Sequence, residues 1–224
     1  IILKSKNLKF ERNKNILSSD FKTSLEDNLG NILNFEKFTY DTLEGIIEVI
    51  NLNFKDVENN NFRLAEATVN INTKEIVGKD AKLYFSKSTF GNSENDPRIF
   101  GNSLIRNENS TTLTKAIFTS CKFREKEKCP PWILKADEVK HDKKKKSIEY
   151  KNAWLKIYDV PIIYFPIFFH PDPTVKRQSG FLMPKISNSS FLGNSIQVPY
   201  YKVISNDKDF TFSPRIFLDD KFLI

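Results

Sequence analysis

The chain has 224 residues, a length that suits one large domain or two small ones. Its 35 Lys and Arg residues outnumber the 28 Asp and Glu residues and give a net charge of +7. A basic chain can bind nucleic acid, but Lys, Asn, Ile and Phe are all over-used here, which indicates a biased base composition rather than a selected basic face. No apolar run approaches the ~20 residues of a membrane helix, because the longest one, Val160–Phe169, is short and contains two prolines.

Both ends of the sequence look cut. The chain begins at Ile1 rather than at Met, and it ends inside the apolar run Phe222–Ile224. We therefore expect a fragment of a longer protein, for which the missing signal peptide says nothing about location.

Strand patterns dominate residues 1–170. Ala67, Val69 and Ile71 alternate with polar residues, which is the period of a half-buried strand. Asn-rich or Gly-containing breaks are predicted to separate such runs, at residues 58–61, 91–95 and 101–102. Amphipathic helical spacing is scarce. Only in Ser24–Leu33 does the pattern leave undecided whether a helix forms.

A weak internal repeat runs through this part of the chain. The first unit is Val69–Ile76 followed by Lys79–Leu83, and the second is Val139–Ile148 followed by Lys151–Leu155. Each unit reads as strand, polar turn, strand, and repeated units of this size indicate stacked β-structure. The charge run Lys143–Lys146 falls in the second turn and is interpreted as a solvated hairpin tip, with a role near anionic lipid head groups as the lesser alternative.

Two cysteines, Cys121 and Cys129, flank a charged loop. In an exported protein such a pair suggests disulfide chemistry, whereas two unpaired thiols would fit a cytosolic one. Zinc would need more ligands, and the two histidines, His141 and His170, lie at no finger-like spacing.

The pattern changes after residue 170. A polar connection with prolines precedes three predicted strand runs, Gly180–Ile186, Ser195–Ile204 and Asp209–Leu218. In the last two runs, apolar and aromatic residues alternate with polar ones. The apolar face would point to a core in a soluble sandwich and to lipid in a membrane barrel, and periodicity alone does not separate the two.

Prolines interrupt these runs. Pro184 lies in the first, Pro199 in the second and Pro214 in the third. Proline donates no ladder hydrogen bond and is normally confined to edges or bulges. Pro184 and Pro199, on neighbouring strands, are therefore predicted to weaken the sheet at one place, although an edge strand of a soluble domain would also accept them.

No catalytic motif is found. The sequence has no Gly-rich phosphate loop, no G-x-S-x-G and no H-E-x-x-H. Asp172 near His170 could suggest acid–base chemistry, but both residues lie in a proline-bearing connection that is interpreted as a rigid turn. We expect no enzymatic activity.

The most distinctive stretch is Cys129–Leu182, which contains CPPWILKADEV, SIEYKNAWLKIYDVPIIYFPIFFHPDP and TVKRQSGFL. A Trp after a double proline, an apolar run broken by Pro161 and Pro166, and a basic turn before an apolar segment seldom occur together. The stretch resembles the junction between the periplasmic domain and the β-barrel of the LptD family, outer-membrane proteins that place lipopolysaccharide in the outer leaflet. The resemblance covers about residues 115–218.

This resemblance implies an all-β chain in two parts. Residues 1–170 would form a periplasmic OstA-like β-jellyroll of stacked strand pairs. Residues 171–224 would form a linker and the first strands of an outer-membrane β-barrel. The implied function is non-enzymatic lipopolysaccharide transport, with an LptE-like lipoprotein plug and an LptA-like periplasmic bridge as partners, and with no cofactor, metal or nucleic acid.

The resemblance also implies roles for individual residues. An apolar jellyroll groove would shield the acyl chains of lipid A, and its candidate lining residues are Ile133, Val139, Ile148, Leu155, Ile157 and Ile162. Pro184 and Pro199, in the motifs GFLMP and VPYY, would permit a lateral opening of the barrel, with Pro214 as a further contributor. The implied export favours oxidised Cys121 and Cys129, and whether they pair with each other or with other cysteines stays open.

Two alternatives remain. A soluble lipid-binding jellyroll without a barrel predicts protein cover over the apolar side chains Ile196, Val198, Phe210 and Phe212. A carbohydrate-active β-sheet enzyme, using acids such as Asp172 or Asp137, predicts two carboxylates ~5–10 Å apart in one cleft.

Overall fold

The computed structural model describes the chain except for residues 1, 27–29, 58, 88–93, 123–129, 173, 174, 176, 191, 192, 206, 218–221 and 224. Nearly all regular structure in the described residues is antiparallel β-strand, which confirms the predicted all-β fold class. The chain divides into two compact units, Ile1–Pro173 and Thr174–Ile224. No helix in the described part of the chain is long and apolar enough to cross a membrane.

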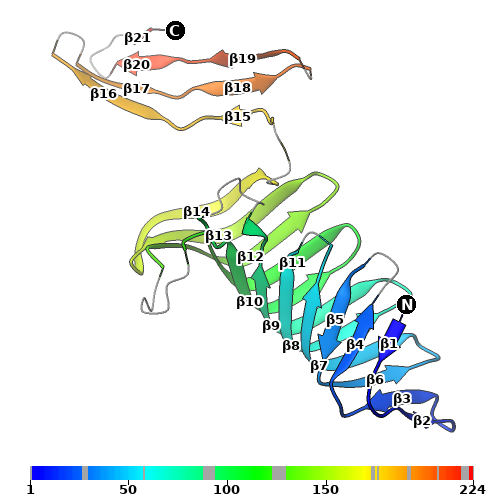
Figure 1. Ribbon diagram of the computed structural model, residues 1–224. Helices are drawn as coiled ribbons and strands as arrows, with labels where there is room; N and C mark the ends of the chain where they lie inside the picture. The colour runs from blue at the N-terminus through cyan, green and yellow to red at the C-terminus, as the bar shows by residue number, and fades with distance from the viewer. Residues whose placement is uncertain are drawn as a thin grey trace. The chain divides into compact units, whose positions relative to one another are not determined.

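The strands of the two units are labelled in Figure 1. Those of the first unit are β1 (Ile2–Lys4), β2 (Lys9–Glu11), β3 (Ile16–Ser19), β4 (Thr23–Glu26), β5 (Ile32–Phe35), β6 (Lys37–Asp41), β7 (Ile46–Lys55), β8 (Asn61–Asn70), β9 (Glu75–Tyr84), β10 (Arg98–Arg106), β11 (Ser110–Thr119), β12 (Trp132–Asp142), β13 (Ser147–Ile157) and β14 (Val160–Pro171). Those of the second unit are β15 (Gly180–Phe181), β16 (Lys185–Ser189), β17 (Gly193–Gln197), β18 (Tyr200–Val203), β19 (Asp209–Phe212), β20 (Arg215–Phe217) and β21 (Phe222–Leu223).

Within the described residues, the first unit is one 14-stranded sheet in which β7 to β14 pair in sequence order (Figure 1). The sheet branches at β7. One half of β7 pairs with β6, which continues to β3 and β2, and the other half pairs with β5, which continues to β4 and β1. The two halves of β7 therefore have different neighbours on this side, whereas the later long strands keep the same neighbours along their whole length. We call the two halves of the long strands the two arms.

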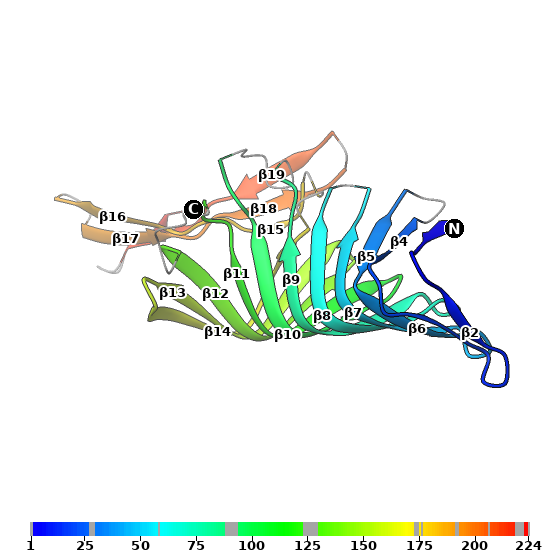
Figure 2. The ribbon, with the colours of Figure 1, turned by 60° about the horizontal axis from the view of Figure 1, so that its bottom comes forward.

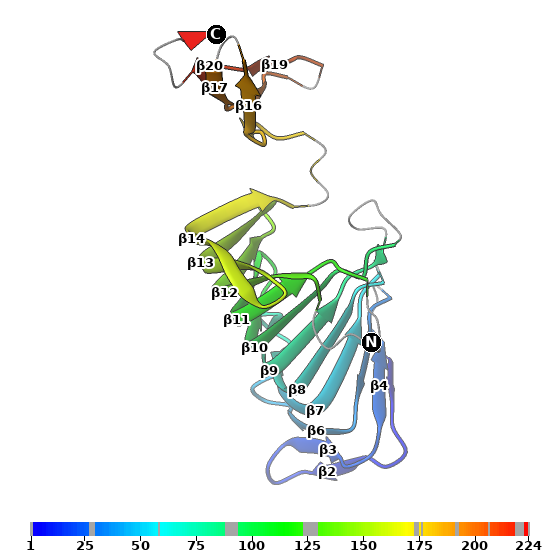
Figure 3. The same cartoon turned by 90° about the vertical axis from the view of Figure 1, so that its left-hand side faces the viewer.

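Each arm begins at a bend near the middle of a long strand. Four non-glycine residues with positive φ mark bends, and each precedes a buried Leu or Ala; the pairs are Asn51-Leu52, Asp80-Ala81, Lys115-Ala116 and Asn152-Ala153. Regular pairing is interrupted at these points. The pairing register is the same on both sides of each bend, while the buried apolar positions change phase by one residue there, as from Val49 to Leu52 in β7. The buried apolar residues of both arms therefore belong to one core, and the bend of the long strands can be followed in Figures 2 and 3.

The core lies in this interior. A row of cross-strand neighbours lines the first arm: Phe38, Val49, Ala67, Gly78, Leu104, Leu113, Val139, Tyr150 and Phe168. A second row lines the second arm: Leu33, Phe54, Phe62, Leu83, Ile99, Phe118, Leu134, Leu155 and Ile163. Most of these side chains are buried. Burial of apolar area, at about 25 cal/mol per Å², stabilises the packing of the two arms against each other.

The hairpin turns at the tips of the first arm share one cap. A side-chain Oδ1 accepts the backbone N–H groups two and three residues later, and the capping residues are Asp41, Asn70, Asn107 and Asp142. Such Asx turns fix a tight reversal. Both units of the internal repeat are hairpins capped in this way, and the turn at Lys143–Lys146 confirms the predicted hairpin tip.

Two sequence-based expectations change. The stretch Ser24–Leu33, which left a helix open, contributes to β4 and β5, because Leu25 and Leu33 pair and extend the apolar row of the second arm. The predicted break at residues 101–102 is wrong, since both lie inside β10. Gly101 sits at a bend, where a Cβ atom would lie 3.1 Å from Leu113 Cδ2 and 3.1 Å from the Thr114 carbonyl oxygen.

In the second unit each predicted run is split at its proline rather than continuous. Pro184 separates β15 from β16, Pro199 separates β17 from β18, and Pro214 separates β19 from β20. The halves pair as β15-β18-β19 and as β16-β17-β20-β21. Proline has a fixed φ and no N–H, so it ends the regular ladder on each strand. Leu218, the last residue of the predicted third run, lies outside the described residues.

Candidate functional site

Four of the six predicted groove residues face the interior of the first unit. Val139 belongs to the buried row of the first arm, and Ile148 follows on the same face beyond Tyr150. Leu155 belongs to the row of the second arm, and Ile157 lies opposite Trp132 on that face. Ile148 and Leu155 pack against the core.

The other two groove candidates lie elsewhere. Ile133 sits between inward-facing Trp132 and Leu134 and pairs with Lys156, so it faces the outer surface. Ile162 lies on β14 at a register shift and is 53% exposed. The alternating pattern correctly predicts a strand here. It does not show that Leu134, rather than Ile133, faces the interior.

The interior is packed in its middle and open at β13 and β14. Val139 and Ala153 are buried, whereas Ile157 and Ile163 are 43% and 44% exposed. Among the described strands β14 pairs only with β13, so it is an edge. An accessible apolar strip, defined here as Leu155, Ile157 and Ile163, therefore continues from the packed core to the sheet edge.

An arginine that sequence reasoning missed also faces the interior. Arg106 ends β10 and pairs with Ile76 and Thr111 on the inner face of the first arm. Its guanidinium carbon lies 5.2 Å from the ring centroid of Phe54 and 4.8 Å from that of Phe62. Both rings belong to the second arm, so this contact crosses the interior. The sequence could have indicated this position, because Arg106 lies two residues after the inward-facing Leu104 and alternate residues of a strand share a face.

Polar side chains follow Arg106 along the same rim. The Tyr150 hydroxyl lies 3.0 Å from His170 Nε2, and His170 Nδ1 lies 2.7 Å from the Pro171 carbonyl oxygen. Nδ1–H must donate to that carbonyl, so Nε2 accepts from Tyr150. Burial raises the pKa of the Tyr150 hydroxyl. His141 Nε2 lies in contact with a carboxylate oxygen of Asp172. These groups lie at the tip of the first arm, at the opposite end of β13 from the strip.

The carboxylates considered for catalysis are separated. Asp137 accepts a hydrogen bond from Asn152 Nδ2 at 3.0 Å on the outer surface. Of the described residues that line the cleft beside Asp137, none is a second carboxylate. Asp172 instead contacts His141 near the β12–β13 turn. Asp137 and Asp172 are therefore not found together in the cleft beside Asp137.

Cys121 is half-buried at the end of β11. Its thiol lies 3.9 Å from the Trp132 carbonyl oxygen, and its own carbonyl accepts a hydrogen bond of 2.7 Å from Arg98. Cys129 lies outside the described residues. The disulfide stays a prediction.

The three prolines of the second unit lie on neighbouring strands, and we call Pro184, Pro199 and Pro214 the proline seam. Around it the backbone is joined by isolated bonds, from Leu182 N to the Pro199 carbonyl at 2.8 Å and from Val198 N to the Pro214 carbonyl at 3.2 Å. Regular pairing resumes on either side. Backbone hydrogen bonds between the described strands of the second unit are therefore sparsest along the seam.

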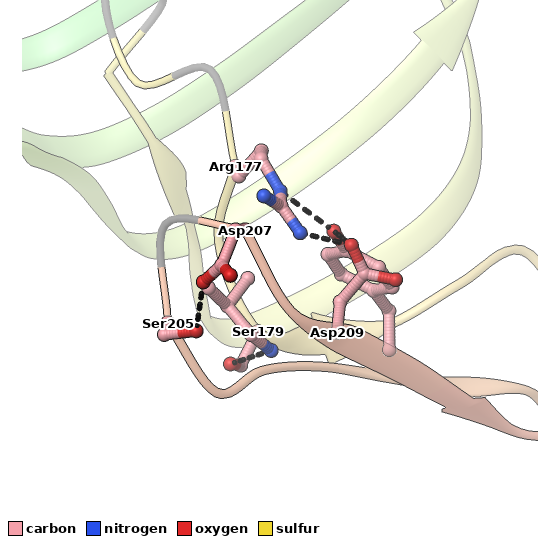
Figure 4. Close-up of polar contacts among 7 residues, drawn as sticks. Arg177, Ser179, Ser205, Asp207 and Asp209 are labelled. Carbon is pink, nitrogen blue, oxygen red and sulfur yellow. Dashed lines mark hydrogen bonds and ion pairs between the residues drawn. The ribbon is translucent and has the colours of Figure 1, made fainter.

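The connection before β15 is anchored to the second unit. Arg177 Nε donates to the Tyr201 hydroxyl at 3.1 Å, and its guanidinium forms an ion pair with Asp209 (Figure 4). Ser179 Oγ accepts the Val203 N–H at 2.9 Å (Figure 4). These contacts fix the entry of the chain to β18 and β19.

Apolar side chains of the second unit stay exposed. Phe210 and Phe212 are 49% and 46% exposed, and Phe181 and Ile186 are more so. Ile196 and Val198 are half-buried. The described residues do not provide the full protein cover that a soluble jellyroll without a barrel predicts.

These features define an all-β protein in which a bent jellyroll with an apolar interior precedes an antiparallel unit interrupted by prolines. No family model matches the chain. The chain is similar to the LPS-assembly protein LptD of Shewanella frigidimarina, with 38% identity over 114 residues, and to that of Shewanella denitrificans, with 39% over 114 residues. The LptD of Nitrosomonas eutropha is 32% identical over 125 residues.

The matched part is 49–53% of this chain but only 14–17% of the length of these relatives. This similarity confirms the resemblance to LptD that was inferred from the sequence.

Proposed function

We propose that this chain takes part in lipopolysaccharide assembly at the outer membrane of a Gram-negative bacterium. The observation that carries the proposal is the similarity of half the chain to LPS-assembly protein LptD. In this proposal the chain passes a lipid along its surface and catalyses no reaction.

Lipid A would travel along the inner face of the first unit. The apolar strip Leu155, Ile157 and Ile163 supports this, because it is accessible at the sheet edge and continues to Val139 and Ile148. Burial of acyl chains contributes roughly 0.8 kcal/mol per CH₂, so such a strip can hold a lipid without a catalytic group. Ile133 and Ile162 are left out of this groove.

The exit would be a lateral gate at the proline seam. The second unit would supply the first strands of an outer-membrane β-barrel, with the exposed aromatic face toward lipid and the sugars entering the lumen. Pro184 and Pro199 would weaken the pairing of these strands with the barrel's last strand. The scarcity of ladder bonds along the seam supports this assignment.

The location and partners follow from the same proposal. The first unit would lie in the periplasm, where Cys121 and Cys129 would be oxidised. An LptA-like bridge would deliver lipid to the first unit, and an LptE-like lipoprotein would plug the barrel. The strands β1 and β2 support the bridge, because among the described strands each has a single neighbour and leaves backbone groups for a further strand.

A charge placed in the groove tests this function. Ile157→Asp in the full-length protein should lower the amount of newly made lipopolysaccharide that reaches the cell surface, because acyl chains would meet a carboxylate. Ile133→Asp, on the neighbouring strand but on the outer face, is the matched control. Equal delivery by both variants and the wild type, at equal protein levels, would contradict the groove.

A further inference from the structure

We propose that Arg106 and Lys143 form a binding subsite for the phosphate of an amphiphile whose acyl chains lie in the jellyroll interior. The inference rests on the proposed function, since it names the head-group chemistry that the same groove would recognise.

Arg106 stands where the two arms meet. It belongs to β10 at the tip of the first arm, yet its guanidinium covers Phe54 and Phe62 of the second arm. The ring faces attract the cation. The side chain therefore spans the interior between the two arms at this point.

An incoming acyl chain competes for the same ring faces. Phe54 and Phe62 are buried members of the apolar row, and their rings pack at 5.3 Å between centroids. Apolar chains that occupy the interior gain most where they cover such rings. The guanidinium is then displaced toward the rim, where its N–H groups can donate to the oxygens of a phosphate group.

Lys143 adds a second cation at this rim. Its Nζ donates to the carbonyl oxygen of Asn107, the residue after Arg106, at 3.2 Å. Burial and the nearby Arg106 charge both lower the pKa of Lys143. Glu108 opposes this, but its carboxylate is also paired with Lys74 at 2.6 Å. Arg106 and Lys143 therefore place two cationic side chains at the rim next to the apolar interior.

A phosphate monoester can bind both cations at once, because it has three terminal oxygens and a charge of about −1.5 to −2. Arg presents two parallel N–H donors to phosphate oxygens, and Lys adds a mobile point charge. To bind in the apolar interior as well, the same molecule must carry long alkyl chains. Together these requirements describe a phosphorylated amphiphile, and the phosphates of lipid A meet them.

The test compares lipids that differ only in phosphate. Full-length protein with a photoreactive residue at position 157 is exposed to bisphosphorylated lipid A or to monophosphoryl lipid A, and the captured lipid is measured. We expect the wild type to capture the bisphosphorylated lipid about 5–10-fold better, as for one charge-assisted contact. Arg106→Gln should remove this preference and Arg106→Lys should keep part of it.

Arg63→Gln is the matched control. Arg63 also covers an aromatic ring, with its guanidinium carbon 5.3 Å from the Tyr84 centroid, but it pairs with Lys82 and Asn53 on the outer face. Arg63→Gln should leave the lipid preference unchanged.

Each outcome decides. Equal capture of the two lipids by the wild type would overturn the phosphate subsite and leave the groove intact. Capture of neither lipid would overturn the proposed function itself. Inorganic phosphate that abolishes the preference at millimolar concentration would indicate a free-anion site and overturn the lipid assignment. If Arg106→Gln does not fold, the capture of the two lipids by the wild-type protein still tests the phosphate subsite.

Discussion

Small residues at the bends let the two arms of the first unit approach each other. Gly78 lies in the row of the first arm, and a Cβ atom there would lie 2.8 Å from Leu64 Cδ1 and 3.0 Å from the Glu66 carbonyl oxygen. The backbone oxygen cannot move away without distorting the ladder. Glycine is thus required here for space.

Gly78→Ala should lower the free energy of unfolding by about 1–3 kcal/mol, as expected for an overpacked core. Chemical denaturation of the two proteins measures this difference. Gly180→Ala is the control, because nothing lies within 4 Å of a Cβ atom at that position. A Gly78 variant as stable as the Gly180 variant would show that the bend is looser than described.

The turn caps make one part of the stability depend on pH. The carboxylate of Asp142 accepts the backbone N–H of Lys145 and of Lys144, and the Lys145 bond is the main cause that lowers the pKa of Asp142. A carboxyl group with a lowered pKa in the folded state stabilises the fold above its unfolded pKa, near 3.9. That contribution is lost as the pH falls through the folded-state value.

Asp142→Asn keeps an acceptor oxygen but has no charge to titrate. The wild type should therefore be the more stable of the two at pH 7, and the gap should shrink as the pH falls below about 4. Urea midpoints of both proteins across this range provide the measurement. A gap that is independent of pH would mean that the charge of Asp142 contributes nothing to the turn.

At the scale of elements, the sequence predicted strands and turns well but not their shape. Alternation identified the strands around Val69 and Ile157, and the lysine run identified a turn. The bends escaped notice because Asn51 and Asn152 look like ordinary polar positions of an alternating strand. Their positive φ appears only when neighbouring strands are paired. The same phase shift explains why Ile133 was assigned to the inner face.

The seam prolines were recognised as interruptions, while their effect was underestimated. Each proline ends one strand and separates it from the next, so three predicted runs became six strands. Contacts between segments that are distant in the sequence could not be predicted from the sequence pattern. Arg106 meets Phe54 and Phe62 only because the strands bend.

Restoring the seam donors tests the gate. In Pro184→Ala with Pro199→Ala, each new N–H can add a bond worth about 0.5–1.5 kcal/mol. Such a gain is small beside the stability of a barrel but comparable to the bias that keeps a gate shut. The folded double variant should deliver less lipopolysaccharide to the cell surface.

Pro166→Ala, a proline substitution on the edge strand β14 outside the seam, is the control and should leave delivery unchanged. Normal delivery by a well-expressed double variant would contradict the gate. A double variant that does not assemble would show instead that these prolines shape the barrel.

At the scale of the whole molecule, the two units would have different tasks in the proposed function. The first unit offers an apolar interior with a cationic rim, and the second offers a sheet with a built-in weak line. In the proposed path, lipid A moves along the first and leaves through the second. The path requires that the inner face, and not the outer face, of β12 and β13 contacts lipid.

Photocrosslinking in living cells tests this requirement most directly. A photoreactive residue is placed at Leu155, Ile157 or Ile163 on the inner strip and, in separate proteins, at Ile133 on the outer face. The account predicts lipopolysaccharide adducts at the three inner positions and none at Ile133. Adducts only with protein at every inner position, or equal lipid adducts on both faces, would contradict it.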